Sequence, residues 1–293
     1  MRSRRWSRLL IQLGTMVFFG LSAWLGGAVG FQETDDEERQ IFEVDFLNAR
    51  ARARTPQTKA TGRPGIASDL LGITLWRMRP AGSGDDTQAR LLDHEGDSET
   101  ALVGERVSSE TKFKEGQKVR LSIESARNGY LYVIDREQYA DGTFSDPYLI
   151  FPTLRINNGD NAVTAGRLVE LPDQNDRPFY FKMKRSRTDQ IGEVLTMFVT
   201  SKPISDLQLT RRPLKLTPQQ FAEWEQASKA PTKRVEVVKL AGTTYTRAEM
   251  SAGARSTTVL ARQDPPPQTI YRISAKPGDP VLITLTLRYD EKK

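Results

Sequence analysis

Apolar and polar residues alternate along much of the chain between Leu71 and Tyr289. Val119, Leu121 and Ile123 are separated by charged and hydroxyl residues, and the run from Val281 to Leu287 repeats the pattern. Alternation with a period of two is typical of a strand with one buried face. The pattern predicts strands over residues 72–80, 117–125, 130–137, 148–152, 167–172, 178–184, 193–201 and 235–240, and two more within 269–289.

Turn signals connect some of these strands. Asn128-Gly129 stands between two alternating runs, which favours a β-hairpin. Lys276-Pro277-Gly278-Asp279 has the proline and glycine positions of a type II turn, which predicts a C-terminal hairpin over residues 269–289. Residues 82–100 are polar, and we expect them to form a long loop after the first strand. That strand then needs a distant partner, and the hydrophobic C-terminal strand is the one expected. This pairing makes residues 71–290 a single β-rich domain.

One helix is predicted over residues 217–229. Thr217 is placed to cap it, with Pro218 at the first helical position and Gln220 at the third, an arrangement typical of a capping box. Phe221 and Trp224 share a face and should dock on a sheet. The predicted fold class is therefore mainly β: an antiparallel β-sandwich or barrel-like domain with one short amphipathic helix.

Residues 1–30 have the layout of a signal peptide or membrane anchor. Four arginines precede an apolar run over residues 9–29, and Ala28 and Gly30 would suit cleavage before Phe31. Both alternatives export the rest of the chain, so we expect a periplasmic or secreted protein, anchored to the inner membrane through 9–29 if uncleaved. Residues 31–70 are expected to be a flexible linker. The alternatives are that this segment contains a short helix or that it binds a partner.

Composition excludes several function classes. The formal net charge is +6, but without the arginines of the first thirty residues 39 basic and 37 acidic residues remain, so a nucleic-acid partner is not expected. The chain has no cysteine and a single histidine, His94, which excludes thiolate sites and multi-histidine zinc sites. There is no nucleophile elbow and no phosphate-binding glycine loop. We therefore predict no catalytic residues, no metal site and no cofactor.

The stretch REQYADGTFSDPY, residues 136–148, is the candidate site. Its acidic residues do not have the spacing of a calcium loop. Asp141-Gly142 instead predicts a turn, and Asp146-Pro147 predicts an extended start to the next strand. The structural interpretation is a hairpin tip on which the aromatic rings pack. The functional interpretation is a ligand or weak cation site, with Tyr139, Asp141, Asp146 and Tyr148 as the candidate binding residues.

Several short motifs resemble one bacterial family. They are Gly129-Tyr130-Leu131-Tyr132, Phe151-Pro152, Ala165-Gly166 and Leu171-Pro172. In this order they are similar to the family catalogued as domain of unknown function 4384. The resemblance covers residues 72–200 best, and it implies an exported or envelope-associated all-β domain. It implies no catalytic residues, because the matching positions are turn and core residues.

Two functions follow from this reading. The first is a non-catalytic β-rich binding or interaction module of the cell envelope, whose partner is an envelope protein or a surface polymer. The second is a carboxylate-dependent glycan hydrolase with Asp141 and Asp146 as its acid pair. The oligomeric state stays open.

Overall fold

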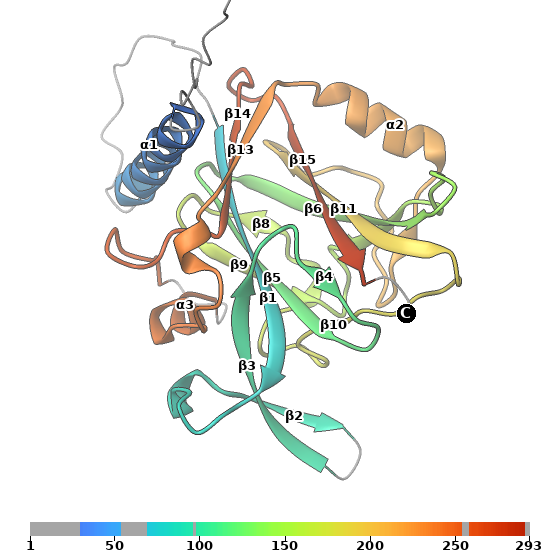
Figure 1. The fold of residues 1–293 in the computed structure, drawn as a ribbon. Coiled ribbons are helices and arrows are strands. Elements are labelled where there is room, and N and C mark those ends of the chain that lie inside the picture. Colours follow the sequence, from blue (N-terminus) through green and yellow to red (C-terminus); the bar gives the residue numbers. More distant parts are fainter. Residues whose placement is uncertain (1–29, 54–68, 96–97, 254–257, 291–293) are drawn as a thin grey trace, which may run out of the picture.

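A computed structural model describes residues 30–53, 69–95, 98–253 and 258–290. The protein is mainly β, as predicted, and its strands form two sheets packed face to face (Figure 1). The eight-stranded sheet contains β1 (Asp69–Pro80), β2 (Leu91–Glu95), β3 (Ser98–Val107), β5 (Lys118–Ser125), β9 (Leu168–Leu171), β10 (Phe181–Lys182), β13 (Thr232–Glu236) and β14 (Thr269–Ile273).

The seven-stranded sheet contains β4 (Lys112–Phe113), β6 (Gly129–Tyr139), β7 (Tyr148–Phe151), β8 (Ala162–Val163), β11 (Gln190–Thr200), β12 (Leu214–Lys215) and β15 (Val281–Tyr289). Its pairs are antiparallel except for β15 with β4. The helices are α1 (Gly30–Ala53), α2 (Pro218–Ala227) and α3 (Arg247–Gly253), and the 3-10 turns are η1 (Thr87–Ala89), η2 (Asn157–Gly159) and η3 (Val238–Leu240).

The main core lies between the two sheets. The period-two faces of β5, β6, β11 and β15 all contribute to it, among them Leu121, Val133, Met197 and Ile283. The predicted helix α2 covers the other face of the seven-stranded sheet. Its capping box is formed as expected, with the Gln220 N–H donating to Thr217 Oγ1 at 3.1 Å. Phe221 is buried against that sheet, and Trp224 stacks on Phe198 with ring centres 5.5 Å apart.

Both predicted hairpins are wrong. β5 and β6 belong to different sheets, so the segment with Asn128-Gly129 crosses the sandwich instead of joining neighbours. The same holds for β14 and β15 within residues 269–289. The turn between them is formed as predicted, because Gly278 has φ +91° and the Asp279 N–H donates to the Lys276 carbonyl at 3.0 Å. Turn chemistry therefore predicted a reversal correctly but not the sheet that the next strand joins.

The partner of the first strand also differs from the expectation. β1 pairs with β14, residues 269–273, while the hydrophobic final strand β15 pairs with β11 in the other sheet. The polar segment 82–100 is not one long loop, because it contains η1, β2 and the start of β3, which pairs with β2. Strand β13 ends at Glu236, and η3 follows where the strand over residues 235–240 was expected to continue.

Strands β1 and β5 of the eight-stranded sheet are largely buried on both faces, where the pattern predicted a single buried face. Arg120, Ser122 and Glu124 point away from the main core and are still at most 3% exposed. Helix α1 covers part of this outer face (Figure 1), with Phe42 and Phe46 packed near Ile270. Within the predicted linker 31–70, residues 31–53 therefore belong to a docked helix and residues 69–70 begin β1, while 54–68 lie outside the described residues. The predicted signal or anchor segment lies outside the described residues.

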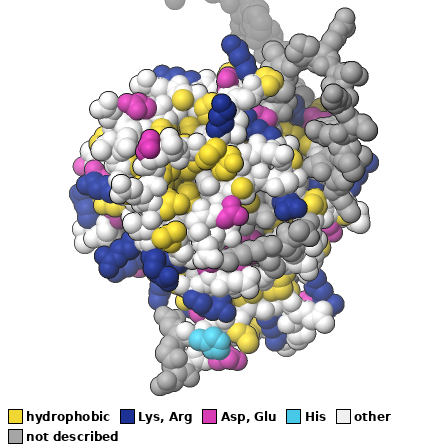
Figure 2. Space-filling view, turned by 180° about the vertical axis from the view of Figure 1, so that it is seen from behind, with side chains coloured by type: hydrophobic (Ala, Val, Ile, Leu, Met, Phe, Trp, Pro, Cys, Tyr) yellow, Lys and Arg dark blue, Asp and Glu magenta, His cyan; other side chains and the backbone are white. Residues whose placement is uncertain are grey.

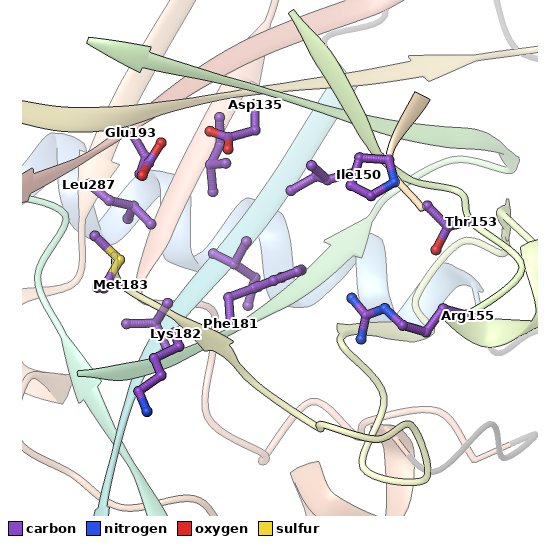
Figure 3. A pocket seen from close by; sticks show the side chains of 13 residues that line it. Asp135, Ile150, Thr153, Arg155, Phe181, Lys182, Met183, Glu193 and Leu287 are labelled. Carbon is purple, nitrogen blue, oxygen red and sulfur yellow. The ribbon is translucent and has the colours of Figure 1, made fainter. Parts of the chain in front are cut away.

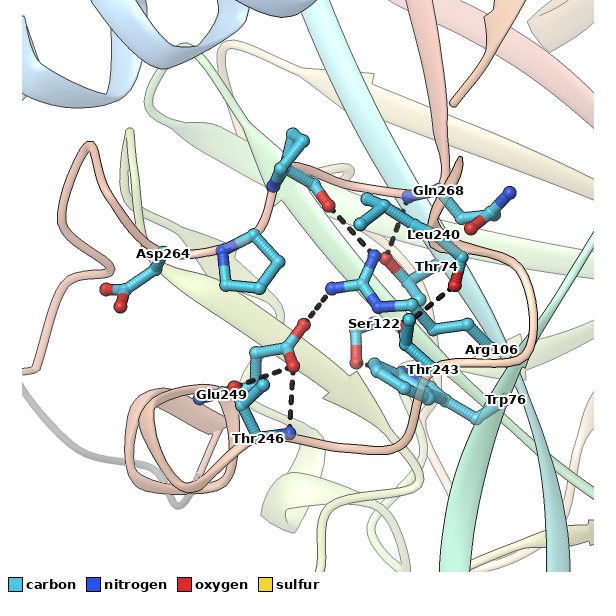
Figure 4. Close-up of polar contacts among 12 residues, drawn as sticks. Thr74, Trp76, Arg106, Ser122, Leu240, Thr243, Thr246, Glu249, Asp264 and Gln268 are labelled. Carbon is cyan, nitrogen blue, oxygen red and sulfur yellow. Dashed lines mark hydrogen bonds and ion pairs between the residues drawn. The ribbon is translucent and has the colours of Figure 1, made fainter. Parts of the chain in front are cut away.

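Three buried ion pairs lie on the outer face of this sheet, and two of them hold helices α1 and α3 to it. Arg50 of α1 pairs with Glu124 at 2.6 Å, Arg120 pairs with Glu170 at 3.1 Å, and Arg106 pairs with Glu249 of α3. Figure 4 shows the guanidinium of Arg106 among the residues of α3 and the 264–268 segment. Its Nη1 donates to the Pro266 carbonyl at 2.8 Å. Each charge has a partner, which is what burial of charged groups requires.

Candidate functional site

The predicted turn at the tip of the β6–β7 connection is formed. Gly142 has φ +85°, and its N–H donates to the Tyr139 carbonyl at 3.0 Å. The carboxylate of Asp141 accepts from the Thr143 hydroxyl at 2.6 Å and from the Thr143 N–H at 2.9 Å. These hydrogen bonds lower the pKa of Asp141. Its carboxylate therefore stabilises the turn.

A groove of about 760 Å³ lies beside this connection. It is lined by Asp135, Glu137, Tyr139, Phe144, Ser145, Asp146, Tyr148, Ile150, Arg187, Arg212 and Pro213. Three of the four predicted binding residues, Tyr139, Asp146 and Tyr148, are in this lining. Asp141 is not among the lining residues. The single histidine, His94, lies elsewhere on the surface (Figure 2), and it is not part of the groove.

The aromatic residues of the groove have two different roles. Tyr139 is 6% exposed and donates its hydroxyl to Glu137 at 2.7 Å, and the Arg187 guanidinium lies 3.9 Å from its ring centre. Tyr139 is therefore a packed part of the wall. Phe144 and Tyr148 are 42% and 39% exposed, so their rings remain accessible to a partner.

An inner cavity of about 220 Å³ adjoins the groove, since Asp135, Ile150 and Pro213 line both. It reaches between the sheets, and most of its walls are apolar side chains. Its full lining is Val119, Leu121, Asp135, Ile150, Thr153, Arg155, Phe181, Lys182, Met183, Glu193, Leu195, Pro213 and Leu287. Figure 3 shows Asp135 and Glu193 on one side of this space and the guanidinium of Arg155 on the other.

Asp135 and Glu193 form a carboxyl pair at the wall of the inner cavity. They come from neighbouring strands, and Glu193 is opposite Glu137 in the register of β6 and β11. Their side chains share a hydrogen bond. Among the described residues, Asp135 Oδ1 and Glu193 Oε2 are buried without any hydrogen-bond donor. A single proton held between the two carboxyls accounts for this arrangement.

The surroundings of the pair favour its protonated form. Burial raises the pKa of Asp135 to about 7, and the nearby charge of Glu137 adds to this. Burial and the charge of Asp135 raise the pKa of Glu193 to about 8. The other oxygen of Glu193 accepts from Gln190 Nε2 at 2.7 Å and from the Tyr289 hydroxyl at 3.2 Å. Adjacent carboxyl groups in an apolar wall can hold a proton near neutral pH or accept donors from a ligand.

Sequence reasoning missed Glu193, Arg187 and Arg212, which lie far along the chain from the candidate stretch, and also Arg155, seven positions after its end. A signal for Glu193 was present. Glu193, Leu195 and Met197 share one period-two face, and the last two are buried, so a carboxylate at the end of that face points toward the core. Asp135 follows Leu131 and Val133 in the same way on β6.

Within the described residues, no group of three or more histidine, aspartate or glutamate side chains is arranged to hold a metal ion. In the same part of the chain no helix has the length and apolar content needed to span a bilayer. Comparisons with family models, with curated proteins and with solved structures find no match to this chain. The family resemblance of the sequence motifs therefore stays a prediction.

Proposed function

We propose that the chain is an exported, non-catalytic binding domain of the cell envelope that holds a surface polymer in the groove beside the β6–β7 connection. The observation that carries this proposal is the groove itself, in which exposed aromatic rings stand next to charged side chains. Aromatic faces and directed polar groups are the usual elements of a recognition surface. The export part rests on the N-terminal sequence pattern alone.

The groove is polar as well as aromatic. Glu137 and Arg187 lie in its lining next to Tyr139, and Asp146 forms an ion pair with Lys215 at its rim. Such a surface suits a ligand with many hydroxyl or amide groups, which can exchange hydrogen bonds with charged side chains while a flat face lies on a ring. An envelope protein is the other partner class, and binding to protein instead of polymer would contradict the proposal.

The test is cosedimentation with purified envelope polymers. The double variant Phe144→Ala/Tyr148→Ala should lower binding by about tenfold or more, because aromatic side chains dominate such interfaces. Both side chains are exposed, so the fold should keep its thermal midpoint. The matched control is Val238→Ala, which truncates a 58% exposed apolar side chain on η3. Equal binding by the double variant and the control would refute the role of the groove.

The hydrolase alternative needs a different acid pair from the one the sequence indicated. Asp141 is used in its own turn, and Asp146 is paired with Lys215. The raised pKa values favour Asp135 and Glu193 as acids. Glycosidase carboxyls stand about 5 to 9.5 Å apart, however, to admit the sugar or a water. Asp135 and Glu193 are in direct hydrogen-bond contact, which favours a binding role. Turnover of any envelope glycan that Glu193→Gln abolishes would reverse this choice.

A further inference from the structure

The inner cavity carries an inference that deepens the proposed function, since it opens on the same groove. Three polar atoms around it are buried and have no hydrogen-bond partner among the described residues. They are Asp135 Oδ1, Glu193 Oε2 and Arg155 Nη1. All three residues line this one cavity. The shared proton pairs the two carboxyl oxygens at low pH; once it is lost, all three atoms lack partners, and a group bound in the cavity can supply them.

The positions of the three atoms define the chemistry of that group. The carboxyl pair lies on one side of the cavity and the Arg155 guanidinium points into it from the other (Figure 3). Carboxylate oxygens accept hydrogen bonds, and a guanidinium can only donate them. A ligand that satisfies both must present donors at one end and an acceptor at the other. The walls between are apolar, with Phe181 and Leu195 among them.

The size of the cavity limits the ligand. About 220 Å³ lies below the range of about 300–1,000 Å³ that is typical of drug-sized ligands. We propose that the inner cavity binds a small amino carboxylate, with its ammonium on Asp135 and Glu193, its aliphatic part on the apolar wall and its carboxylate on Arg155. Such a ligand is either a free amino acid or the zwitterionic end of the polymer in the groove.

Charges around the carboxyl pair make this binding depend on pH. Glu137 on β6 adds negative charge, and Tyr289 on β15 contacts Glu193 with its hydroxyl. The Arg185 guanidinium lies 4.4 Å from the centre of the Tyr289 ring, and Lys182 and Arg155 add positive charge to the cavity lining. Because the pair holds a proton below about pH 7 to 8, the ligand ammonium must displace it. Affinity should therefore rise from pH 6 to pH 8.5, with protons released on binding.

The test is a calorimetric titration of the 293-residue chain with 4-aminobutanoate, 6-aminohexanoate and 8-aminooctanoate at both pH values. At least one should bind at pH 8.5, and the matching carboxylic acid and alkylamine, which lack one charged end, should bind about tenfold more weakly or worse. Glu193→Gln and Arg155→Gln should each lower affinity by about tenfold or more. Asp141→Asn, the same change of charge outside the cavity, should leave it within about twofold.

Thermal melts of each variant show whether it is folded, and Asp135→Asn replaces Glu193→Gln if that variant is not. No binding of any of the three amino carboxylates at up to about 10 mM, or equal binding of the singly charged analogues, would overturn the proposal. Phe144→Ala/Tyr148→Ala should leave amino carboxylate binding intact if the ligand is free. If the polymer does not cosediment but amino carboxylate binding is retained, the polymer-binding role of the groove is refuted and the ligand site in the cavity still stands.

Discussion

Replacing Arg50 with methionine should destabilise the protein more than any exposed substitution on α1. Arg50 donates to both carboxylate oxygens of Glu124, at 2.7 and 2.6 Å, and also to the carbonyls of Ala261, Asp264 and Pro265 at 3.1 to 3.2 Å. Both side chains of the ion pair are at most 2% exposed. Methionine keeps the apolar stem but leaves Glu124 buried without a counter-charge. Breaking a buried pair in this way costs about 3–5 kcal/mol.

Urea denaturation followed by tryptophan fluorescence measures this cost, and the thermal midpoint should fall by about 10 °C. Burial already raises the pKa of Glu124, and loss of Arg50 should raise it further. Glu124 of the folded variant then takes up a proton as pH falls, so the loss of unfolding free energy relative to the unmodified protein should be largest at pH 8 and smaller toward pH 5. The double variant Arg50→Met/Glu124→Met should recover much of the loss, because no unpaired charge remains.

Lys239→Met is the matched control. Lys239 also pairs with α1, through Glu43 at 2.9 Å, but its side chain is 66% exposed. That pair should contribute less than about 1 kcal/mol. If Arg50→Met and Lys239→Met cost the same, the buried pair does not hold α1 to the sheet and the reasoning fails.

Two further predictions concern stability. The pKa values of Asp135 and Glu193 are raised in the folded state, so the free energy of unfolding should fall as pH rises from about 5 to about 8. In urea titrations, Glu193→Gln should flatten this pH dependence by up to about 1.4 kcal/mol per pH unit. Parallel pH dependences of the variant and the unmodified protein would contradict the shared proton. Gly72→Ala should cost about 1–3 kcal/mol, because its Cβ would lie 2.1 Å from Pro267 Cγ, while Gly84→Ala, with open space around it, should be near neutral in the same denaturation assay.

The sequence predicted most strands of the fold but not their neighbours. Alternation depends on local burial, and β5, β6, β11 and β15 all showed it. Which sheet a strand joins depends on contacts between residues far apart in the chain. Arg120 and Glu124 read as solvent-facing because charged residues usually are. Their partners Glu170 and Arg50 lie 50 and 74 positions away, and no local pattern connects them.

The candidate site was predicted in part for the same reason. One continuous stretch holds Glu137, Tyr139, Asp146 and Tyr148, so composition alone drew attention to it. The inner cavity is formed by segments from Val119 to Leu287, and only the folded sheets bring them together. The inward-facing positions of Glu193 and Asp135 were the local clues to this cavity.

The pairing of β1 with β14 determines when this chain can fold. Asp69 lies opposite Ile273, about two hundred residues later, and β14 and β15 are each flanked by strands on both sides. When a ribosome has released the chain only up to residue 268, each sheet still lacks a strand. Premature termination there would leave unpaired edges in both layers, which is a condition that favours aggregation and proteolysis. The nascent protein is therefore expected to stay unfolded, or shielded, until residues 269–289 emerge.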